Sequence, residues 1–191
     1  MRGDYTVALR EWRSLAEQGV AAAQSNLADM YKLGLGVPRD YAAAVRWYRK
    51  ASEQGDAKAQ HNFGGALYSG RGIPQDYDEA ARWFYKASQR GNTKAQFSLG
   101  LMYAKGDGVA RDDVQAYKWL ALAASRTPPG KVRFRMSRIR LFIAGRMTID
   151  QISEGRRLVG EWLATFQEAR NRHRQIRSNA SVWRTGFPLA S

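Results

Sequence analysis

Two histidines and a group of three aspartates are the side chains of this 191-residue chain best suited to proton transfer or metal binding. His61 lies off the apolar stripe of the helix that we predict around it, which indicates an exposed side chain, and His173 lies in an arginine-rich tail. Neither has a sequence neighbour that would make it a general base. Asp107, Asp112 and Asp113 lack the spacing of a calcium-binding loop, and Asp112 is better placed to cap a helix.

The chain contains no cysteine, which excludes disulfides, thiolate metal sites and cysteine nucleophiles. It also contains no Gly-x-Ser-x-Gly elbow, no phosphate-binding loop and no His-Glu-x-x-His motif. Its Gly-x-Gly steps join one predicted helix to another rather than a strand to a helix, so they do not indicate dinucleotide binding. We therefore expect a protein without enzymatic activity, cofactor or metal ion.

Basic residues are the other group that could bind a ligand, because 31 Lys and Arg against 17 Asp and Glu give a net charge of +14. Residues 1–125 hold 17 basic and 13 acidic residues, whereas residues 126–191 hold 14 basic and 4 acidic ones. The C-terminal excess can serve as a contact for nucleic acid, anionic lipid or an acidic protein. It can equally be the solvated face of a capping helix. The candidate anion contacts are Lys131, Arg133, Arg135, Arg138, Arg170, Arg172, Arg174 and Arg177.

The apolar residues form no stretch that could cross a membrane. The longest uninterrupted apolar run is residues 119–124, far below the roughly 20 residues that a membrane helix needs. Met1 is not followed by a signal-peptide pattern, so the sequence as it stands predicts a cytoplasmic protein. The alternative is a periplasmic or exported protein whose signal peptide lies upstream of Met1.

The elements that must position these side chains are repeated. Trp47, Trp83 and Trp119 stand 36 residues apart, and residues 23–58 and 59–94 share 16 identical positions. Unrelated segments of that length would share about two. Alanines, Ala-Gln pairs, glycines and capping aspartates recur with the same period: Ala23, Ala59, Ala95, Gly34, Gly70, Gly106, Asp40, Asp76 and Asp112.

Each repeat predicts two short helices. In the first unit, Ala23, Leu27 and Tyr31 follow a helical period, and Gly34 stands where a helix ends in a left-handed residue. Asp40 is placed as the N-cap of a second helix. Neither helix can bury its apolar stripe alone, so the units must stack into an all-α solenoid.

Strings such as AQSNLADMYKLGLGVPRDYAAAVRWYRKASEQG and AQFSLGLMYAKGDGVARDDVQAYKWLALAA resemble the Sel-one-like repeat (SLR) family, whose members are related to tetratricopeptide (TPR) repeats. The resemblance covers residues 4 to 125, with mild departures at Leu67, Ala110 and Asp113. It implies a right-handed α-solenoid of helix-turn-helix repeats that acts as a bacterial protein-interaction scaffold.

This resemblance and the apolar patterning divide the chain into four parts. Residues 1–19 form an N-terminal half-repeat, which is either a capping helix or the incomplete start of a longer array. Residues 20–125 form three 36-residue helical hairpins, and residues 126–168 form a closing helix pair whose second helix opens with a capping box at Thr148 and Gln151. Residues 169–191 form a basic tail that we expect to be irregular.

The resemblance also suggests where a ligand would bind, because in such solenoids the first helix of each unit lines the concave surface. Positions off the packing stripe that vary between units are the candidate groove residues: Asn26, Asp29, Asn62, Tyr68, Phe97 and Leu101. Phe97 and Leu101 form an apolar patch there, or else pack against the closing helices or a neighbouring unit. Because the repeats are close to neutral, we expect a groove of little net charge.

Two functions follow from these features. The first is a non-enzymatic scaffold or adaptor that binds a peptide or a protein surface in the concave groove. The alternative is an anionic-surface or nucleic-acid binding module that uses the arginine-rich C-terminal segment. The sequence does not indicate an oligomeric state.

Overall fold

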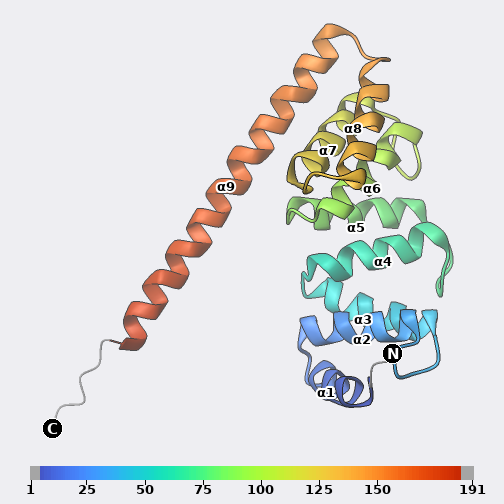
Figure 1. The fold of residues 1–191 in the computed structure, drawn as a ribbon, viewed down its shortest axis with the longest axis vertical. Coiled ribbons are helices and arrows are strands. Elements are labelled where there is room, and N and C mark those ends of the chain that lie inside the picture. Colours follow the sequence, from blue (N-terminus) through green and yellow to red (C-terminus); the bar gives the residue numbers. More distant parts are fainter. Residues whose placement is uncertain (1–4, 186–191) are drawn as a thin grey trace.

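The computed structural model describes residues 5–185, with the side chains of residue 173 and residues 177–185 outside the description. This part of the chain forms nine α-helices and no strand, which confirms the predicted all-α solenoid. Figure 1 shows the helices stacked in layers from α1 to α8, with α9 running away from the stack. The helices are α1 (Thr6–Glu17), α2 (Ala21–Leu33), α3 (Tyr41–Glu53), α4 (Ala57–Ser69), α5 (Tyr77–Gln89), α6 (Thr93–Lys105), α7 (Asp113–Arg126), α8 (Lys131–Ala144) and α9 (Ile149–Thr185).

The recurring aspartates begin the second helix of each unit, as predicted. The Asp40 carboxylate accepts a hydrogen bond from the backbone N–H of Ala43 at 2.9 Å, and Asp76 and Asp112 cap α5 and α7 in the same way. The first helices end at left-handed glycines, among them Gly70 with φ 69°. Polar caps and glycine ends therefore set the length of each hairpin.

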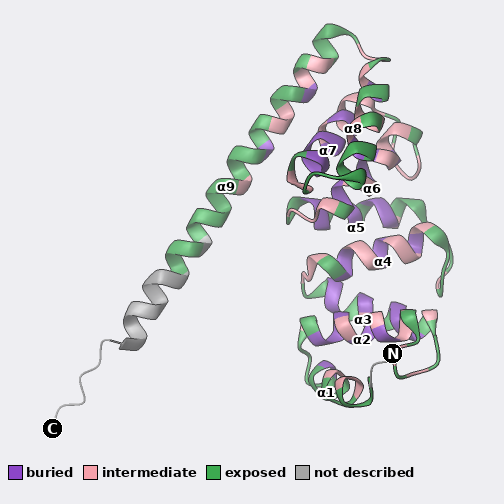
Figure 2. Cartoon of the chain, in the orientation of Figure 1, coloured by how far each residue is buried: buried purple, intermediate pink, exposed green. Residues whose placement is uncertain are grey.

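Small and large apolar side chains alternate through the layers of the solenoid. Alanines such as Ala59 and Ala95 are fully buried, which lets neighbouring helices approach closely, and Phe63 and Trp119 fill the space between them. Figure 2 shows that burial is concentrated in α2 to α7. Of the three repeated tryptophans, Trp119 alone is fully buried, whereas Trp47 and Trp83 are half-buried at the edge of the core.

A buried glutamine joins each unit to the helix that precedes it. The side-chain amides of Gln24, Gln60 and Gln96 donate to the carbonyl oxygens of residues 16, 52 and 88 at 3.1, 3.1 and 3.2 Å. Those carbonyls lie in the last turns of α1, α3 and α5, where each also accepts the backbone N–H of the glycine three residues later and has a second lone pair free for the glutamine. The recurring Ala-Gln pair is thus a joint between units.

The turn inside each hairpin makes a second joint. A Cβ atom added at Gly72, whose φ is 77°, would lie 2.5 Å from the carbonyl carbon of Tyr41, the first residue of α3 in the preceding unit. Gly108 meets Tyr77 of α5 in the same way. Only glycine allows the turn of one unit to rest on the backbone of the unit before it.

The closing helices cover the third unit and reach the end of the second. Met136 and Ile143 of α8 are buried against apolar clusters that α7 contributes to. Trp162 of α9 donates from Nε1 to the side-chain oxygen of Gln89 at 2.8 Å and stacks on Phe166 at a ring distance of 4.6 Å. The predicted capping box at the start of α9 is also present, since Thr148 and Gln151 exchange hydrogen bonds.

The C-terminal segment differs from the sequence-based expectation of an irregular tail from residue 169. The backbone is helical to Thr185, so α9 continues 17 residues beyond the predicted end of the closing pair. Residues 161–185 contain neither glycine nor proline and are rich in arginine, glutamine and alanine, all of which favour helix. No helix within the described residues is both long and apolar enough to span a membrane.

Candidate functional site

Two pockets adjoin on the side of the solenoid that α2 and α4 share. The first, of about 170 Å³, lies between α2, α3 and α4, and the second, of about 490 Å³, reaches from α2 and α4 to the start of α6. Lys32, His61 and Asn62 line both pockets, so the two form one continuous surface, here called the groove. The other groove residues that carry polar side chains are Asp29, Tyr41, Tyr48, Lys58, Ser69, Arg71, Asn92, Thr93 and Lys94.

A hydrogen-bonded cluster centred on Asp29 forms one wall of the groove. The Asp29 carboxylate accepts from the phenol of Tyr48, from the Asn62 amide at 3.4 Å and from the Lys58 ammonium at 2.6 Å. Burial, and then hydrogen bonding to Asp29, raises the pKa of Tyr48 well above its ordinary value. Tyr48 therefore stays protonated, and the cluster holds Asn62 and Lys58 in fixed positions.

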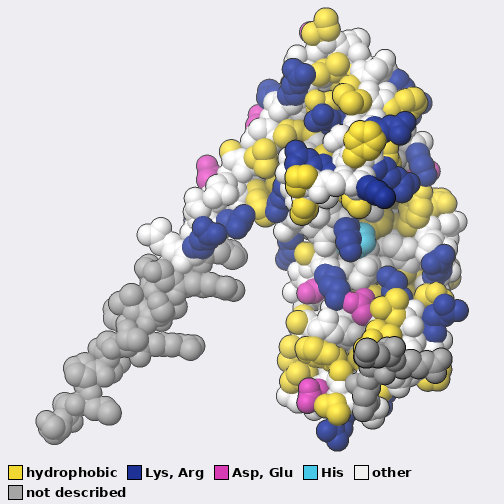
Figure 3. All heavy atoms as spheres, viewed as in Figure 1, with side chains coloured by type: hydrophobic (Ala, Val, Ile, Leu, Met, Phe, Trp, Pro, Cys, Tyr) yellow, Lys and Arg dark blue, Asp and Glu magenta, His cyan; other side chains and the backbone are white. Residues whose placement is uncertain are grey.

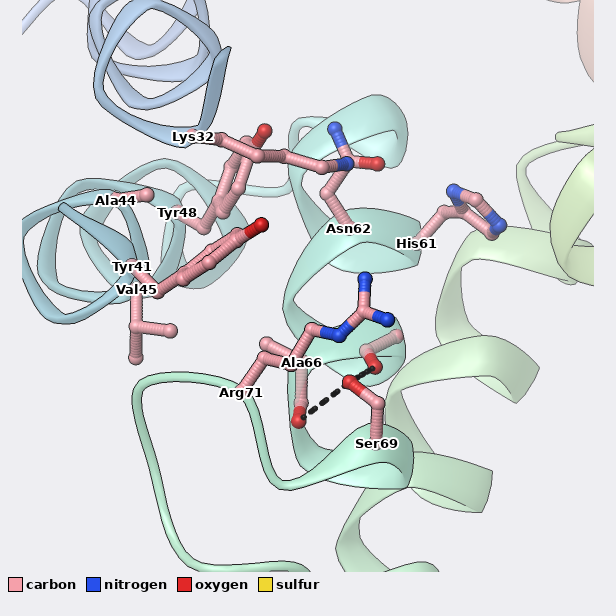
Figure 4. A pocket seen from close by; sticks show the side chains of 11 residues that line it. Lys32, Tyr41, Ala44, Val45, Tyr48, His61, Asn62, Ala66, Ser69 and Arg71 are labelled. Atoms are coloured by element: carbon pink, nitrogen blue, oxygen red, sulfur yellow. Dashed lines mark hydrogen bonds between the residues drawn. The ribbon is translucent and has the colours of Figure 1, made fainter. Parts of the chain in front are cut away.

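Figure 4 shows how the remaining polar side chains lie around the first pocket. The Lys32 ammonium, the Asn62 amide, the Tyr41 phenol and the Arg71 guanidinium point toward the same space. They come from α2, α4, the first residue of α3 and the turn after α4. Because Lys and Arg donate only and an amide both donates and accepts, the arrangement suits a ligand rich in carbonyl or carboxylate oxygens.

The sequence-based prediction that the His61 side chain is exposed is wrong. It is half-buried, and its ring lies 5.6 Å from that of Phe84 in α5. The pKa of His61 is lowered to about 4, chiefly by burial and also by the nearby Lys94 and Lys32, while a hydrogen bond with Asn62 opposes them. The residue lies off the apolar stripe of α4, but α5 of the same unit covers that side of the helix.

The groove is also more basic than the sequence suggested, so the expectation of little net charge is wrong. Lys32, Lys58, Arg71 and Lys94 line it, and Asp29 is the only carboxylate among the described residues that do so. The net charge summed over the repeats is close to zero because the sum includes aspartates such as Asp56, which cap helices. Those carboxylates are occupied by backbone N–H groups outside the groove.

The six predicted groove residues do not all lie together. Asp29 and Asn62 line the groove, and Asn26 borders it by accepting from Lys58 at 3.2 Å. Tyr68 and Leu101 line a separate pocket of about 210 Å³ beside α5, where Tyr68 donates to Asp107 at 2.8 Å.

The apolar pair in the third unit packs inward instead of forming an open patch. Phe97 and Leu101 are half-buried against the cluster that includes Tyr117 of α7 and Ile143 of α8. This matches the alternative in which the pair packs against the closing helices. The groove is therefore confined to the first two units and the start of the third.

Several groove residues had not been predicted. Lys32 occupies the same repeat position as Tyr68, so the rule of variable positions on first helices could have found it. Lys58 and Lys94 recur at one repeat position, so a rule that selects variable positions does not select them. Tyr41 and Arg71 come from a second helix and a turn, and no pattern on the first helices points to them.

The predicted anion contacts lie on two separate helices. Lys131, Arg133, Arg135 and Arg138 are exposed on α8, and Arg170, Arg172 and Arg174 are exposed on α9, C-terminal to Phe166, which packs against the apolar core. Figure 1 shows this part of α9 pointing away from the stack. The side chain of Arg177 lies outside the described residues.

Comparison with known proteins agrees with the repeat boundaries. The family model described as "Sel1 repeat" matches residues 21–56, 57–92 and 93–127, more than half of the chain. No match was found among curated proteins.

Two solved structures are similar over much of the chain. One is a protective antigen of uropathogenic Escherichia coli strains that displays an SLR fold, with 30% identity and a TM-score of 0.75 over 96% of this chain. The other is a Sel1 repeat protein from Oxalobacter formigenes, with 35% identity and a TM-score of 0.61 over 65% of this chain. The chain spans 37% and 51% of the lengths of these two proteins.

Proposed function

The chain belongs to the Sel1 repeat family, and on that premise we propose that it is a non-enzymatic scaffold that binds a peptide segment or protein surface in the groove. Sel1 repeat proteins are generally protein-interaction scaffolds. The observation that carries the proposal for this groove is its set of unpaired donors. Lys32, Arg71 and Lys94 form no ion pair within the described residues.

These donors favour a partner segment that carries acidic side chains. Asp29, the one carboxylate among the described residues that line the groove, is already bound by Lys58, Tyr48 and Asn62, so it does not neutralise the other cations. A carboxylate of the partner placed between Lys32 and Arg71 would gain two charge-assisted hydrogen bonds. The Asn62 amide is suited to a backbone peptide group of the same segment.

Site-specific photocrosslinking in the source cell tests the proposal. A photoreactive residue is placed at Ser69, which lines the groove, and in a second variant at Arg46, which is exposed on α3 but lines neither pocket. We expect a discrete adduct from position 69 and none from position 46. The adduct should disappear when Lys32→Gln and Lys94→Gln are introduced together.

A matched control separates groove contacts from general attraction. Arg46→Gln with Arg82→Gln removes the same charge from exposed positions on α3 and α5, and the adduct should persist. If both double variants weaken the adduct equally, or if position 46 alone gives one, the groove is not the binding site.

A further inference from the structure

The helix α8 carries apolar side chains on two opposite faces. Met136 and Ile143 are buried against the third unit, but Phe134, Leu141 and Phe142 are 66, 61 and 67% exposed. The exposed three follow positions i, i+7 and i+8, so they form one stripe along the outside of the helix. A helix that only closed the array would need apolar side chains on its inner face alone. Large apolar side chains exposed on the outer face therefore mark an interaction surface.

Basic side chains share this outer stripe. Lys131, Arg135 and Arg138 fall on the same side of α8 as the exposed rings, and the Arg138 guanidinium lies 5.9 Å from the centre of the Phe134 ring. None of the three forms an ion pair within the part of the chain that the structure describes. Figure 3 shows hydrophobic and basic side chains interspersed over the upper part of the molecule, where α8 lies.

The sequence around this face is free of acidic residues. No Asp or Glu occurs between Asp113 and Asp150, while the same stretch holds eight Lys and Arg. Arg146 is tied to Asp113 at 2.7 Å, and Arg140 and Arg126 lie against aromatic rings. The cations of the outer stripe remain available to an outside partner.

We propose that the outer stripe of α8, consisting of Lys131, Phe134, Arg135, Arg138, Leu141 and Phe142, docks on an anionic lipid surface. The helix lies parallel to the surface. Its two phenyl rings and Leu141 enter the boundary between headgroups and acyl chains, and its basic side chains bind headgroup phosphates and carboxylates. The mixture of aromatic and basic residues on one stripe is the composition that such interfacial helices use.

Charge and side-chain chemistry favour a lipid surface over other occupants. A second copy of the chain would place the same cations opposite one another with no carboxylate on either stripe, which is repulsive. Nucleic acid would use the arginines and could stack on the phenyl rings, but it offers no apolar medium for Leu141. Of these three occupants, anionic lipid is the one that matches both halves of the stripe.

Co-sedimentation of the full chain with phospholipid vesicles tests the proposal. Vesicles of phosphatidylcholine containing roughly 30% phosphatidylserine are compared with vesicles of phosphatidylcholine alone. We expect binding to the anionic vesicles that weakens as salt is raised, and little binding to the neutral ones. Lys131→Gln, Arg135→Gln and Arg138→Gln should each weaken binding about fivefold. Phe134→Ser with Phe142→Ser should weaken it by about tenfold or more.

Control variants match each change. Arg46→Gln with Arg82→Gln removes charge from another exposed surface, and Val7→Ser with Leu33→Ser removes exposed apolar groups from α1 and α2. Both should bind vesicles like the wild type. Because all these side chains are exposed, circular dichroism and urea unfolding should show each variant folded.

Three results would overturn the proposal. The first is no preference for anionic over neutral vesicles. The second is binding to a DNA or RNA duplex that the glutamine variants abolish and Phe134→Ser with Phe142→Ser leaves unchanged, which identifies nucleic acid as the partner. The third is self-association in sedimentation velocity, lost in the serine variant, without vesicle binding.

Discussion

Replacing Gly72 with alanine tests how closely consecutive units stack. Two costs add at this position. A residue with a Cβ atom is strained at the φ of 77°, which costs roughly 1–2 kcal/mol. The new methyl group would also lie 2.5 Å from the carbonyl carbon and oxygen of Tyr41, which belong to a helix backbone that cannot move freely. Forcing the units apart to accommodate it costs about 1–3 kcal/mol, so we expect a total loss of about 2–5 kcal/mol.

Two other glycines separate these costs. Gly70 lies in the same turn with a φ of 69°, but its added Cβ would meet the Gln75 side chain at an ordinary 3.4 Å. Gly70→Ala should therefore lose only the strain, roughly 1–2 kcal/mol. Gly65 lies inside α4 with no atom near its added Cβ, and Gly65→Ala should gain up to about 1 kcal/mol because alanine favours helix.

Urea unfolding measures all three variants, with far-ultraviolet circular dichroism and tryptophan fluorescence as independent probes. From the most to the least stable, the expected order is Gly65→Ala, wild type, Gly70→Ala and Gly72→Ala. Separate transitions for the two probes in Gly72→Ala would show that the first unit has come loose from the second. If Gly72→Ala and Gly70→Ala unfold at the same urea concentration, the tight contact with Tyr41 does not exist and the stacking described above is wrong.

Three further changes test other parts of the structure. The pKa of His61 is about 4 in the folded protein, against an ordinary value of 6.5. Because the unfolded chain therefore binds a proton more readily, the free energy of unfolding is highest above pH 6.5 and decreases as pH falls toward 4, by up to about 3 kcal/mol. His61→Gln should reduce this decrease, as measured by urea midpoints between pH 6.5 and 4. Trp162→Ala removes a buried ring and should cost about 3–5 kcal/mol, with faster hydrogen exchange in α9; unchanged exchange would contradict the contact with Gln89. Gln96→Ala removes one of the two hydrogen bonds at the carbonyl of Ser88, which keeps the bond from the backbone N–H of Gly91. The variant should lower the thermal midpoint, at a cost of about 0.5–1.5 kcal/mol; an unaltered melt would show that this joint contributes nothing.

Local features of the fold could be predicted from the sequence because they depend on neighbours within one repeat. The Asp40 and Asp76 caps and the box at Thr148 and Gln151 each involve residues three positions apart. The continuation of α9 to Thr185 could not be predicted from apolar periodicity, since that segment has few apolar residues. Its helix propensity, and the lack of glycine and proline, carried the signal instead.

The candidate site was less predictable because it is assembled from several units. Asn62 and Asp29 stood out as variable positions on first helices, yet the role of Asp29 depends on Tyr48 and Lys58, which the repeat brings together across 19 and 29 positions. His61 was misplaced because its burial is supplied by α5, which its own helical stripe does not reveal. Packing between helices decides these environments, within a unit for Tyr48 on Asp29 and between units for Lys58 on Asp29, and the periodicity of a single helix cannot report it.

The glutamine and glycine joints have a consequence for how such an array can change its length in evolution. Gln60 and Gly72 of the second unit both contact the first unit, and Gln96 of the third unit contacts the second. A duplicated copy of residues 57–92, inserted after residue 92, would bring its own pair of joints and offer the next unit the same carbonyl to bind. Whole units can therefore be gained by gene duplication without any compensating substitution. The gain of a single helix would instead place two first helices, or two second helices, next to each other, and neither pair forms these joints.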